Sequence, residues 1–563
     1  MIELLKDNIA PIMFMSVVFF LISGFPVAFS LAACGLLFGF IGIELGVLPG
    51  ELFAALPLRV FGIMQNDTLL AIPFFTLMGL ILERSGMAED LLDTIGRVFG
   101  PIRGGLALAV IFVGALLAAT TGVVAASVIS MGLISLPIML RYGYQREMSC
   151  GVITASGTLA QAIPPSLVLI VMADQLGRSV GDMYRAAFVP AFMLVGMYVL
   201  YVVFLAVVRP TWVPALPPEA RGYREADGSA GYTSLAVLTA VVTVVALLLG
   251  LNYDAIVSAL EGAEVVVATD EKVIASLIAG GGLALVAAIV NRVLKFGLLS
   301  KMAEDVTFVL IPPLGLIFLV LGTIFLGIAT PTEGGAMGAV GAMIMALARR
   351  RLDRVMLVQA LESTARLSCF VLFILIGSTV FSFTFTALDG QMWVEHLFDR
   401  LPGGELGFLI FVNAVIFVLG FFLDFFEIAF ILIPLLAPIA ENMGIDLIWF
   451  GIIIAINLQT SFLSPPFGFA LFYLRSVAPA QRYLDRVHKG SVEGVTTMQI
   501  YRGSIPFVII QLLLLSLLVA FPHLVTGSLG VKTDVDLEGI EIQAPDAGGG
   551  WGEEAPGGWG PSQ

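Results

Sequence analysis

Two Pro-Pro pairs, each beside polar residues in a long apolar stretch, are the features of this 563-residue sequence best suited to chemistry. The first stands in Gln161-Ala-Ile-Pro164-Pro165-Ser166 and the second in Thr460-Ser461-Phe-Leu-Ser464-Pro465-Pro466-Phe467. Proline lacks a backbone N–H and clashes with the preceding helical turn, so each pair should unwind a helix and free its carbonyl groups. Freed carbonyl, hydroxyl and amide oxygens suit a small hard cation such as Na⁺. A simple proline kink is the alternative for each pair.

Two longer apolar stretches, 105–140 and 407–441, are interrupted near their middle by small or polar residues. These residues are Thr120, Thr121, Gly122 and Ser127 in the first stretch and Gly420, Asp424 and Glu427 in the second. Backbone can turn at membrane depth only where protein or a water-filled cavity satisfies it. Each stretch therefore predicts a re-entrant hairpin that lines a transport site. A pair of ordinary spans is the alternative.

The side chains at these hairpin tips have both functional and structural interpretations. Carboxylates within a membrane are energetically costly, so Asp424 and Glu427 are candidates for contact with an ion or a substrate. Asp424 can instead cap the helix that follows it. The hydroxyl groups of Thr120, Thr121 and Ser127 can bond back to helix carbonyls, which is compatible with ion binding.

Composition decides where these segments must lie. Hydrophobic residues make up 59% of the chain and charged residues 12%, about half of the roughly 25% typical of soluble domains. The apolar excess must face lipid, so the chain is a polytopic membrane protein, and the soluble, disordered, disulfide-stapled and nucleic-acid-binding classes are excluded. Cys34, Cys150 and Cys369 each lie in an apolar run and are expected to be small buried residues.

Charged loops set the expected orientation of the spans. Residues 349–354 and 475–502 are rich in arginine, whereas 254–271 and 389–405 are acidic. Lys and Arg are enriched in cytoplasmic loops, so the basic loops are placed inside. Spans of about 20 residues are predicted at 9–24, 27–45, 67–83, 147–175, 184–208, 233–252, 273–291, 306–328, 331–348, 366–388, 447–474 and 503–525.

An internal repeat relates the two halves of the chain. At an offset of 301 residues, Pro137, Gly143, Pro164 and Pro165 fall on Pro438, Gly444, Pro465 and Pro466. The charged flanks make the two hairpins open to opposite sides, which is typical of the inverted repeats of secondary transporters. The expected fold is an all-α polytopic membrane protein with inverted-topology repeats, each containing a re-entrant hairpin and a broken helix.

The chain divides into four predicted parts. Residues 1–208 form the first repeat, with the hairpin 105–140 and the broken span 147–175. Residues 209–302 form an insertion with a Pro-rich linker and two extra spans, which we call the insertion. Residues 303–525 form the second repeat, with the hairpin 407–441 and the broken span 447–474. The acidic tail 526–563 has too little apolar content to fold alone and is expected to be disordered.

Catalytic machinery is not visible in the sequence. His396, His488 and His523 lie in loops or at the end of a span, and motifs for phosphate binding, zinc hydrolysis or a serine nucleophile are missing. No catalytic residue, no cofactor and no metal other than Na⁺ is predicted. The rival interpretation is a polytopic membrane enzyme or channel that uses the same broken helices.

Several motifs together resemble the DctM-like family, the large membrane subunit of tripartite ATP-independent periplasmic (TRAP) transporters. They are Asn66–Gly79, Leu136–Tyr144 followed by Gly157-Thr-Leu and Ile163–Ser166, Gly327–Glu333, and Asn457–Gly468. The resemblance covers most of 10–208 and 303–525.

This resemblance implies Na⁺-coupled uptake of a small organic acid, such as a 2-oxo or hydroxy acid, by an elevator-like motion. It implies a periplasmic binding protein that delivers the acid, a small DctQ-like membrane subunit, and a multi-pass location in the bacterial inner membrane. Another ion-coupled anion transporter without a binding protein is the alternative.

The resemblance also assigns residues to the two kinds of site. Carried over residue by residue, the sodium ligands fall near Ala118, Thr121, Ala160, Ile163, Pro164, Gly420, Asp424, Ser461, Ser464 and Phe467. The candidates for contact with the organic acid are Thr120, Gly122, Ser127, Gln161, Pro165, Ser166, Glu427, Thr460 and Pro466.

Overall fold

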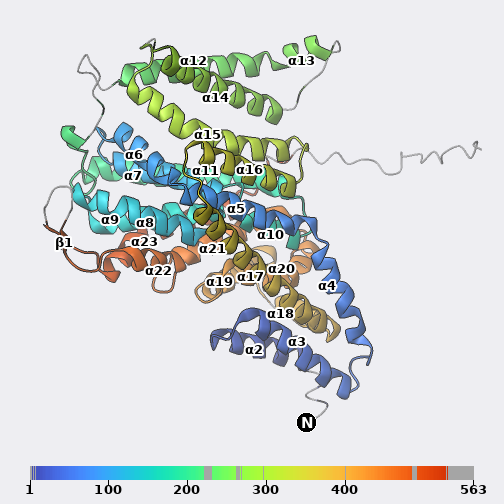
Figure 1. The fold of residues 1–563 in the computed structure, drawn as a ribbon. Helices are drawn as coiled ribbons and strands as arrows, with labels where there is room; N and C mark the ends of the chain where they lie inside the picture. The colour runs from blue at the N-terminus through green and yellow to red at the C-terminus, as the bar shows by residue number, and fades with distance from the viewer. Residues whose placement is uncertain are drawn as a thin grey trace, which may run out of the picture. The chain divides into compact units, whose positions relative to one another are not determined.

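The structure of the chain is a computed structural model in which most of the described residues are helical (Figure 1). It describes residues 8–220, 231–261, 269–295, 297–399, 401–484 and 491–527, together with Glu3, Lys6, Tyr223, Val267 and Leu529. Most of the expected tail 526–563 therefore lies outside the described residues.

The helices follow one another along the chain, with short 3-10 helices labelled η. The first half contains α2 (Ile9–Ile22), α3 (Val27–Glu44), η1 (Leu52–Ala55), α4 (Leu56–Met64), η2 (Asp67–Leu70), α5 (Ala71–Arg84), α6 (Met87–Phe99), α7 (Gly105–Thr121), α8 (Val124–Arg141), α9 (Arg146–Thr158), η3 (Leu159–Gln161), α10 (Leu167–Gln175) and α11 (Val180–Val208). The insertion contains η4 (Pro218–Ala220), α12 (Tyr232–Leu251), α13 (Tyr253–Glu261) and α14 (Thr269–Leu294).

The second half contains α15 (Lys301–Phe325), α16 (Pro331–Ala348), α17 (Arg354–Ala387), α18 (Gly390–Asp399), α19 (Gly404–Leu419), α20 (Phe425–Asn442), α21 (Leu447–Leu463), α22 (Phe469–Val477), α23 (Thr497–Ala520) and α24 (His523–Thr526). Between α22 and α23, the strands β1 (Tyr483–Leu484) and β2 (Ser491–Val492) pair antiparallel, with Tyr483 opposite Val492.

Nine helices in the described part of the chain are long and apolar enough to cross a membrane. They are α3, α8, α11, α12, α14, α15, α17, α20 and α23. A tenth candidate combines residues 52–64 with 67–84, which bend by 48° at the break between them. The shorter apolar helices α2, α7, α19 and α21 have 14 to 17 residues.

Every predicted span contains a helix, although several bounds differ. The helix predicted at 366–388 begins at Arg354, because Asp353 caps it by accepting a 2.6 Å hydrogen bond from the backbone N–H of Met356. Its first turns are polar and fall outside an apolar window. The helices α4, α6 and α18 were not predicted, since they are shorter than a span. In α6, the charged residues Glu89, Asp90 and Arg97 further reduce the apolar signal.

Helices from the two halves interleave (Figure 1). α3 packs against α17, and α5 packs against α16. α8 packs against α22, and α10 packs against α20. The closest crossing joins α9 to α23, where a Cβ atom added to Gly151 would lie 2.0 Å from the carbonyl oxygen of Gly503. Glycine is therefore required at this crossing.

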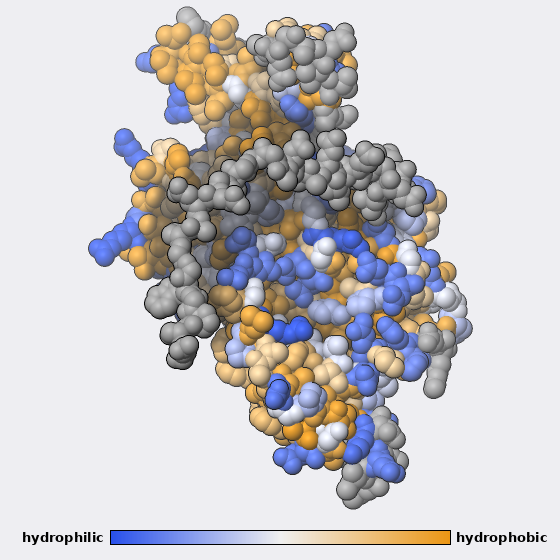
Figure 2. Space-filling view, turned by 90° about the vertical axis from the view of Figure 1, so that its right-hand side faces the viewer, coloured by the Kyte–Doolittle hydropathy of each residue, from blue (hydrophilic) through white to orange (hydrophobic). Residues whose placement is uncertain are grey.

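The insertion begins with a linker that is hydrogen-bonded to the first half of the chain, and it continues as exposed apolar helices. In its linker, the Val213 carbonyl accepts a hydrogen bond from Gly104 N and the Trp212 carbonyl accepts one from Gln145 N, at 2.9 and 3.0 Å. The helices α12 and α14 pack on each other and on α15. α12 contains no buried residue, and Figure 2 shows hydrophobic residues dominating the upper part of the molecule, where these helices lie.

Candidate functional site

The first Pro-Pro pair lies in a completely buried break between η3 and α10. Ser166 caps α10 by accepting a 3.2 Å hydrogen bond from the N–H of Val168. The same hydroxyl donates a 2.9 Å hydrogen bond to the Gln161 carbonyl, which closes the break. All residues from Gln161 to Ser166 are buried, including the predicted sites Ile163, Pro164 and Pro165.

The second pair breaks the chain between α21 and α22, but it is partly exposed. The Ser464 hydroxyl donates a 2.8 Å hydrogen bond to the Thr460 carbonyl. Ser461 and Thr460 likewise bond back to the helix, donating to the carbonyls of Leu458 and Ile456 at 3.3 and 2.9 Å. Pro466 is exposed, and Phe467 is 46% exposed. The two breaks therefore differ in access to the surroundings.

The two broken helices meet at equivalent positions of the repeat. Gln459 Nε2 donates a 3.4 Å hydrogen bond to Thr158 Oγ1, and these residues are 301 positions apart. Both side chains are fully buried. The contact places the helices that lead into the two breaks beside each other in the core.

Buried oxygens without hydrogen-bond partners occur on both helices that lead into the breaks. The Oε1 atoms of Gln161 and Gln459 and the Ser156 hydroxyl are buried and find no partner among the described residues. A buried polar atom left unpaired costs about 1–3 kcal/mol, so it marks a place for a water, an ion or a ligand. Gln161 Oε1 belongs to the first break, and its amide oxygen suits Na⁺ chemically.

The tip of the first hairpin lies against the start of α10. Gly122 ends α7 in the left-handed conformation, with φ of +60°, which favours glycine. A Cβ atom at Gly122 would lie 3.1 Å from Cγ of Leu167. α7, which carries the buried Ala118, also packs against η3, which carries the buried Ala160. The side chains of Thr120 and Thr121 lie outside the described part of the structure, whereas Ser127 is buried.

The turn between α19 and α20, the predicted tip of the second hairpin, lies against α21, which leads into the second break. A Cβ atom at Gly420 would lie 2.1 Å from Ser461 Oγ, so α19 approaches α21 closely. The rings of Phe422 and Phe467 have their centroids 5.5 Å apart. The structure therefore brings the middle turn of each predicted hairpin together with the broken helix of its own half, whereas α8 and α20 are each long enough to be a span, so the re-entrant course of the two stretches stays a prediction.

Asp424 and Glu427 form a capping box at the start of α20. Asp424 Oδ1 accepts a 2.7 Å hydrogen bond from Phe425 N, and Glu427 Oε2 accepts a 2.8 Å bond from Asp424 N. The capping role that the sequence left open for Asp424 is thus present. Contact of either carboxylate with an ion or a substrate stays a prediction.

A polar cleft of about 630 Å³ between α4, α10, α17 and α20 was not predicted from the sequence. Asp174 lines it, and its two carboxylate oxygens accept hydrogen bonds from Asn66 Nδ2 at 2.7 Å and Gln175 Nε2 at 2.9 Å. Arg59 also lines it, with its guanidinium 4.9 Å from the centre of the Phe383 ring. Within the described ranges Arg59 forms no ion pair with a carboxylate.

The sequence carries a signal for Arg59 itself, although not for the cleft around it. Arg59 is the only basic residue between Lys6 and Arg84, and it stands in the apolar segment 56–64. An isolated cation among apolar residues is energetically costly, so its presence marks a candidate functional residue.

Carboxylate, histidine and thiolate ligands do not cluster in the structure. Across the described residues, no three His, Cys, Asp or Glu side chains come close enough to hold a metal ion. A cation at the breaks would therefore be held mainly by carbonyl, hydroxyl and amide oxygens.

Comparisons with known proteins identify the family of this chain. The model of the DctM component of tripartite ATP-independent periplasmic transporters matches residues 14–270 and 273–524. The C4-dicarboxylate TRAP transporter large permease protein DctM of Pseudomonas aeruginosa is 28% identical over 75% of this chain and 80% of its own length. The ectoine TRAP transporter large permease protein TeaC of Halomonas elongata is 24% identical over 91% of this chain and 97% of its own.

Two further comparisons broaden the set. The sialic acid TRAP transporter large permease protein SiaM of Vibrio cholerae is 23% identical over 89% of this chain and 94% of its own length. Among solved structures, the Alcanivorax borkumensis YdaH transporter is similar with a TM-score of 0.47 and 14% identity, over 84% of this chain and 89% of that chain. With its apolar helices and the family match over most of its length, the chain is a multi-pass membrane protein that belongs to the DctM family of tripartite ATP-independent periplasmic transporters.

Proposed function

We propose that this chain is the large permease subunit of a TRAP transporter and that it couples the uptake of a small organic acid to Na⁺. The observation that carries the proposal is the pairing of each hairpin tip with a broken helix, as Gly122 contacts Leu167 and Gly420 contacts Ser461. Secondary transporters bind their ions and substrates at such discontinuous helices.

Helix ends around the breaks supply both kinds of partial charge. α7, α9 with η3, α19 and α21 end toward the tips and breaks, and their C-terminal carbonyls carry partial negative charge that suits Na⁺. α8, α10, α20 and α22 begin there, and their N-termini carry partial positive charge that suits a carboxylate. The unpaired oxygens of Gln161 and Gln459 add ligands that no protein donor occupies.

The packing of the helices supports the inverted repeat. With the offset of about 301 residues, α3 corresponds to α16, α5 to α17, α8 to α20 and α10 to α22. The contact of α3 with α17 then becomes that of α16 with α5, and the contact of α10 with α20 becomes that of α22 with α8. Exchanged contacts are what a two-fold relation between the halves requires. This relation supports an elevator-type motion, in which the hairpins and broken helices move against the remaining helices.

The polar cleft beside α10 and α20 is our candidate route for the organic acid. Arg59 offers a guanidinium that no carboxylate of the described chain occupies, and a guanidinium binds a carboxylate in a bidentate manner. The relatives that carry names for C4-dicarboxylate and sialic acid transport agree with an acidic solute. The acid would pass from this cleft to the positive helix ends at the breaks.

The family also supports the partners that we propose. A tripartite transporter has a periplasmic binding protein and a small membrane subunit besides the DctM component. We therefore place this chain in the bacterial inner membrane, with a DctQ-like subunit beside it and a binding protein on its periplasmic side.

Reconstitution tests the proposal. The chain is co-purified with its small subunit, placed in proteoliposomes and supplied with a candidate binding protein loaded with a labelled organic acid. We expect uptake only with an inward Na⁺ gradient, and none when K⁺ replaces Na⁺. Uptake that is independent of Na⁺, or of the binding protein, would contradict the proposal.

A further inference from the structure

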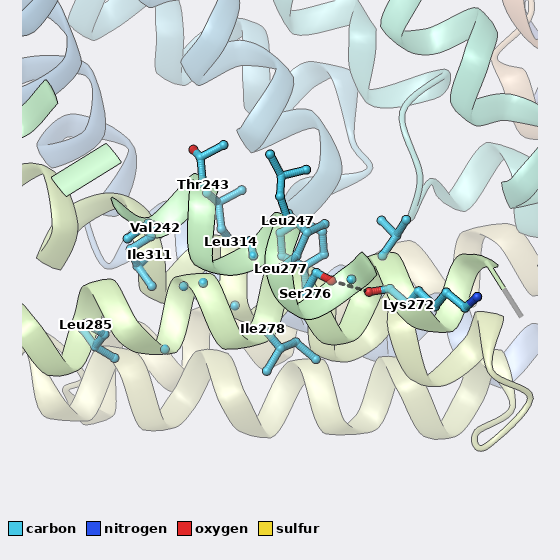
Figure 3. Close-up of a pocket in the computed structure, with 18 of the residues that line it drawn as sticks. Val242, Thr243, Leu247, Lys272, Ser276, Leu277, Ile278, Leu285, Ile311 and Leu314 are labelled. Carbon is cyan, nitrogen blue, oxygen red and sulfur yellow. Dashed lines mark hydrogen bonds between the residues drawn. The ribbon is translucent and has the colours of Figure 1, made fainter. Parts of the chain in front are cut away.

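An apolar cavity of about 830 Å³ lies between α12 and α14 of the insertion and α15, and some of its lining side chains, such as Leu247 and Leu251, are exposed. Figure 3 shows side chains of these helices lining it, with Leu285 toward one end and Lys272 at the other. Apart from Lys272, Thr243 and Ser276 are the polar side chains among its lining residues. The Ser276 hydroxyl is itself occupied, because it donates a 2.6 Å hydrogen bond to the Lys272 carbonyl.

One glycine of α14 and one of α15 border open space in this cavity. Gly282 in α14 and Gly315 in α15 line it, and a Cβ atom added to either would meet no atom within 4 Å. The volume is within the roughly 300–1,000 Å³ that ligand pockets occupy.

Water is a poor occupant for such a space. Apolar cavities stay dry because a water molecule needs two to four polar partners. The three helices around it are candidate membrane spans, and their outer faces carry exposed apolar side chains such as Val244, Leu248 and Val286. The medium that reaches the cavity is therefore hydrocarbon.

The cavity is elongated. From Lys272 to Leu285 it follows α14 for roughly 20 Å. α12, α14 and α15 all contact one another, so a fourth helix could not lie between them without separating them. A hydrocarbon chain is thin enough to lie along this space.

The charged end of the cavity suits a phospholipid headgroup. Lys272 Nζ donates a 2.5 Å hydrogen bond to Asp254 Oδ2, while Asp254 Oδ1 accepts one from Val267 N at 2.9 Å. Lysine has three donors, so two remain for a phosphate beside this ion pair. Lys272 stands at the start of a membrane span, where headgroups lie, and the 20 Å below it exceed the hydrocarbon depth of one leaflet, about 15 Å.

We propose that the cavity between α12, α14 and α15 is a binding site for a phospholipid, with an acyl chain along α14 and the headgroup phosphate at Lys272. The bound lipid fills a space that the three helices leave between them. It thereby joins α12, which has no buried residue of its own, to the rest of the protein.

Native mass spectrometry of the full chain with its small subunit tests the site, with palmitoyl-oleoyl phosphatidylethanolamine added to the detergent-solubilised complex. We expect the wild type to retain a phospholipid that Gly282→Leu and Gly315→Leu lose, because the added side chains fill the cavity. Gly196→Leu is the matched control: Gly196 lies in α11 outside the cavity and also has open space around it.

The headgroup contact is tested separately. Lys272→Gln should weaken retention of the phospholipid about tenfold, since it removes a charge-assisted hydrogen bond, without changing retention of a palmitoyl-oleoyl diacylglycerol. Equal retention of phospholipid by wild type and by both cavity-filled variants, with all proteins monodisperse, would overturn the proposal. The proposal would also be overturned if Lys272→Gln changed the retention of the phospholipid and of the diacylglycerol equally. A helix of the small subunit within the cavity in a density map would overturn it as well.

Discussion

At the scale of single residues, a substitution of Ser464 tests whether the second break binds Na⁺. Its side chain is 4% exposed and bonds to the Thr460 carbonyl, so it lies where a cation would meet the end of α21. Ser464→Leu should lower Na⁺-driven uptake by about 10- to 100-fold, as the loss of oxygen ligands and their supports does at metal sites. The measurement is initial uptake into proteoliposomes as a function of Na⁺ concentration.

Ser476→Leu provides the matched control for this variant. Ser476 bonds back to its own helix in the same way, donating to the Tyr473 carbonyl at 2.7 Å, but it is exposed and lies at the end of α22 that points away from the break. Both variants should remain monodisperse. If Ser464→Leu keeps the Na⁺ dependence of the wild type, Ser464 does not belong to the cation site.

A substitution of Arg59 tests whether the polar cleft binds the organic acid. Arg59→Gln should raise the KM for an anionic solute about tenfold with little change in kcat, because it removes a charged hydrogen-bond donor that binds before the conformational step. Arg366→Gln controls for the loss of a positive charge, since Arg366 is an exposed residue paired only within its helix to Glu362. An equal change in both variants would assign the effect to general charge.

These residues also show how far the sequence could predict the site. The breaks at Pro164-Pro165 and Pro465-Pro466 were predictable because proline acts on its own helix, whatever surrounds it. The capping box of Asp424 with Glu427 is equally local, but the sequence alone does not decide between a cap and a ligand. The cleft at Arg59 was not predictable, since α4, α10, α17 and α20 form it only after the chain has folded.

At the scale of the elements, apolar length and tertiary contacts carry different information. Long apolar runs located the spans because the bilayer dictates their length. The helices α6 and α18 escaped prediction because they are short and polar on one side, and contacts with other helices stabilise them. The pairing of α19 with α21 depends on a glycine, which no hydrophobic pattern marks.

This pairing supplies the prediction for the elements. Gly420 has φ of −65°, which any residue adopts, so the main obstacle to Gly420→Ala is the clash of its Cβ with the Ser461 side chain, whose Oγ and Cβ would lie 2.1 and 3.0 Å away. We expect this variant to lose about 1–3 kcal/mol of stability. Ser461→Gly in the same chain should restore most of the loss, because it removes the side chain that is struck. Thermal unfolding of the purified complex measures both effects.

Gly62→Ala is the control, since an added Cβ there meets nothing within 4 Å. A stable Gly420→Ala protein would mean that α19 and α21 separate readily. If Gly420→Ala is destabilising and Ser461→Gly does not restore the stability, the added methyl group clashes with an atom other than those of the Ser461 side chain.

At the scale of the whole molecule, the two halves are equivalent in sequence but differ in exposure. Ser166 and Phe467 follow the two Pro-Pro pairs at an offset of 301 residues. Ser166 is fully buried, whereas Phe467 is 46% exposed. In a transporter with an inverted repeat, the two halves exchange their conformations between the two end states. The motion must therefore bury the Phe467 position and expose the Ser166 position on the opposite side of the membrane.

Labelling of single cysteines measures this exchange. The background replaces Cys34, Cys150 and Cys369 by alanine, and Cys369 in particular must go because it is exposed, contrary to the expectation from the sequence. In this background, Phe467→Cys should react with a membrane-impermeant maleimide from one side, and Ser166→Cys should react more slowly and from the other side. Addition of Na⁺ and the organic acid should change the two rates in opposite directions, because one population of states grows as the other shrinks. Arg350→Cys, in an exposed loop after α16, should react at a constant rate. If both sites react from the same side, or if their rates rise and fall together, the halves do not exchange and an elevator motion of the broken helices is ruled out.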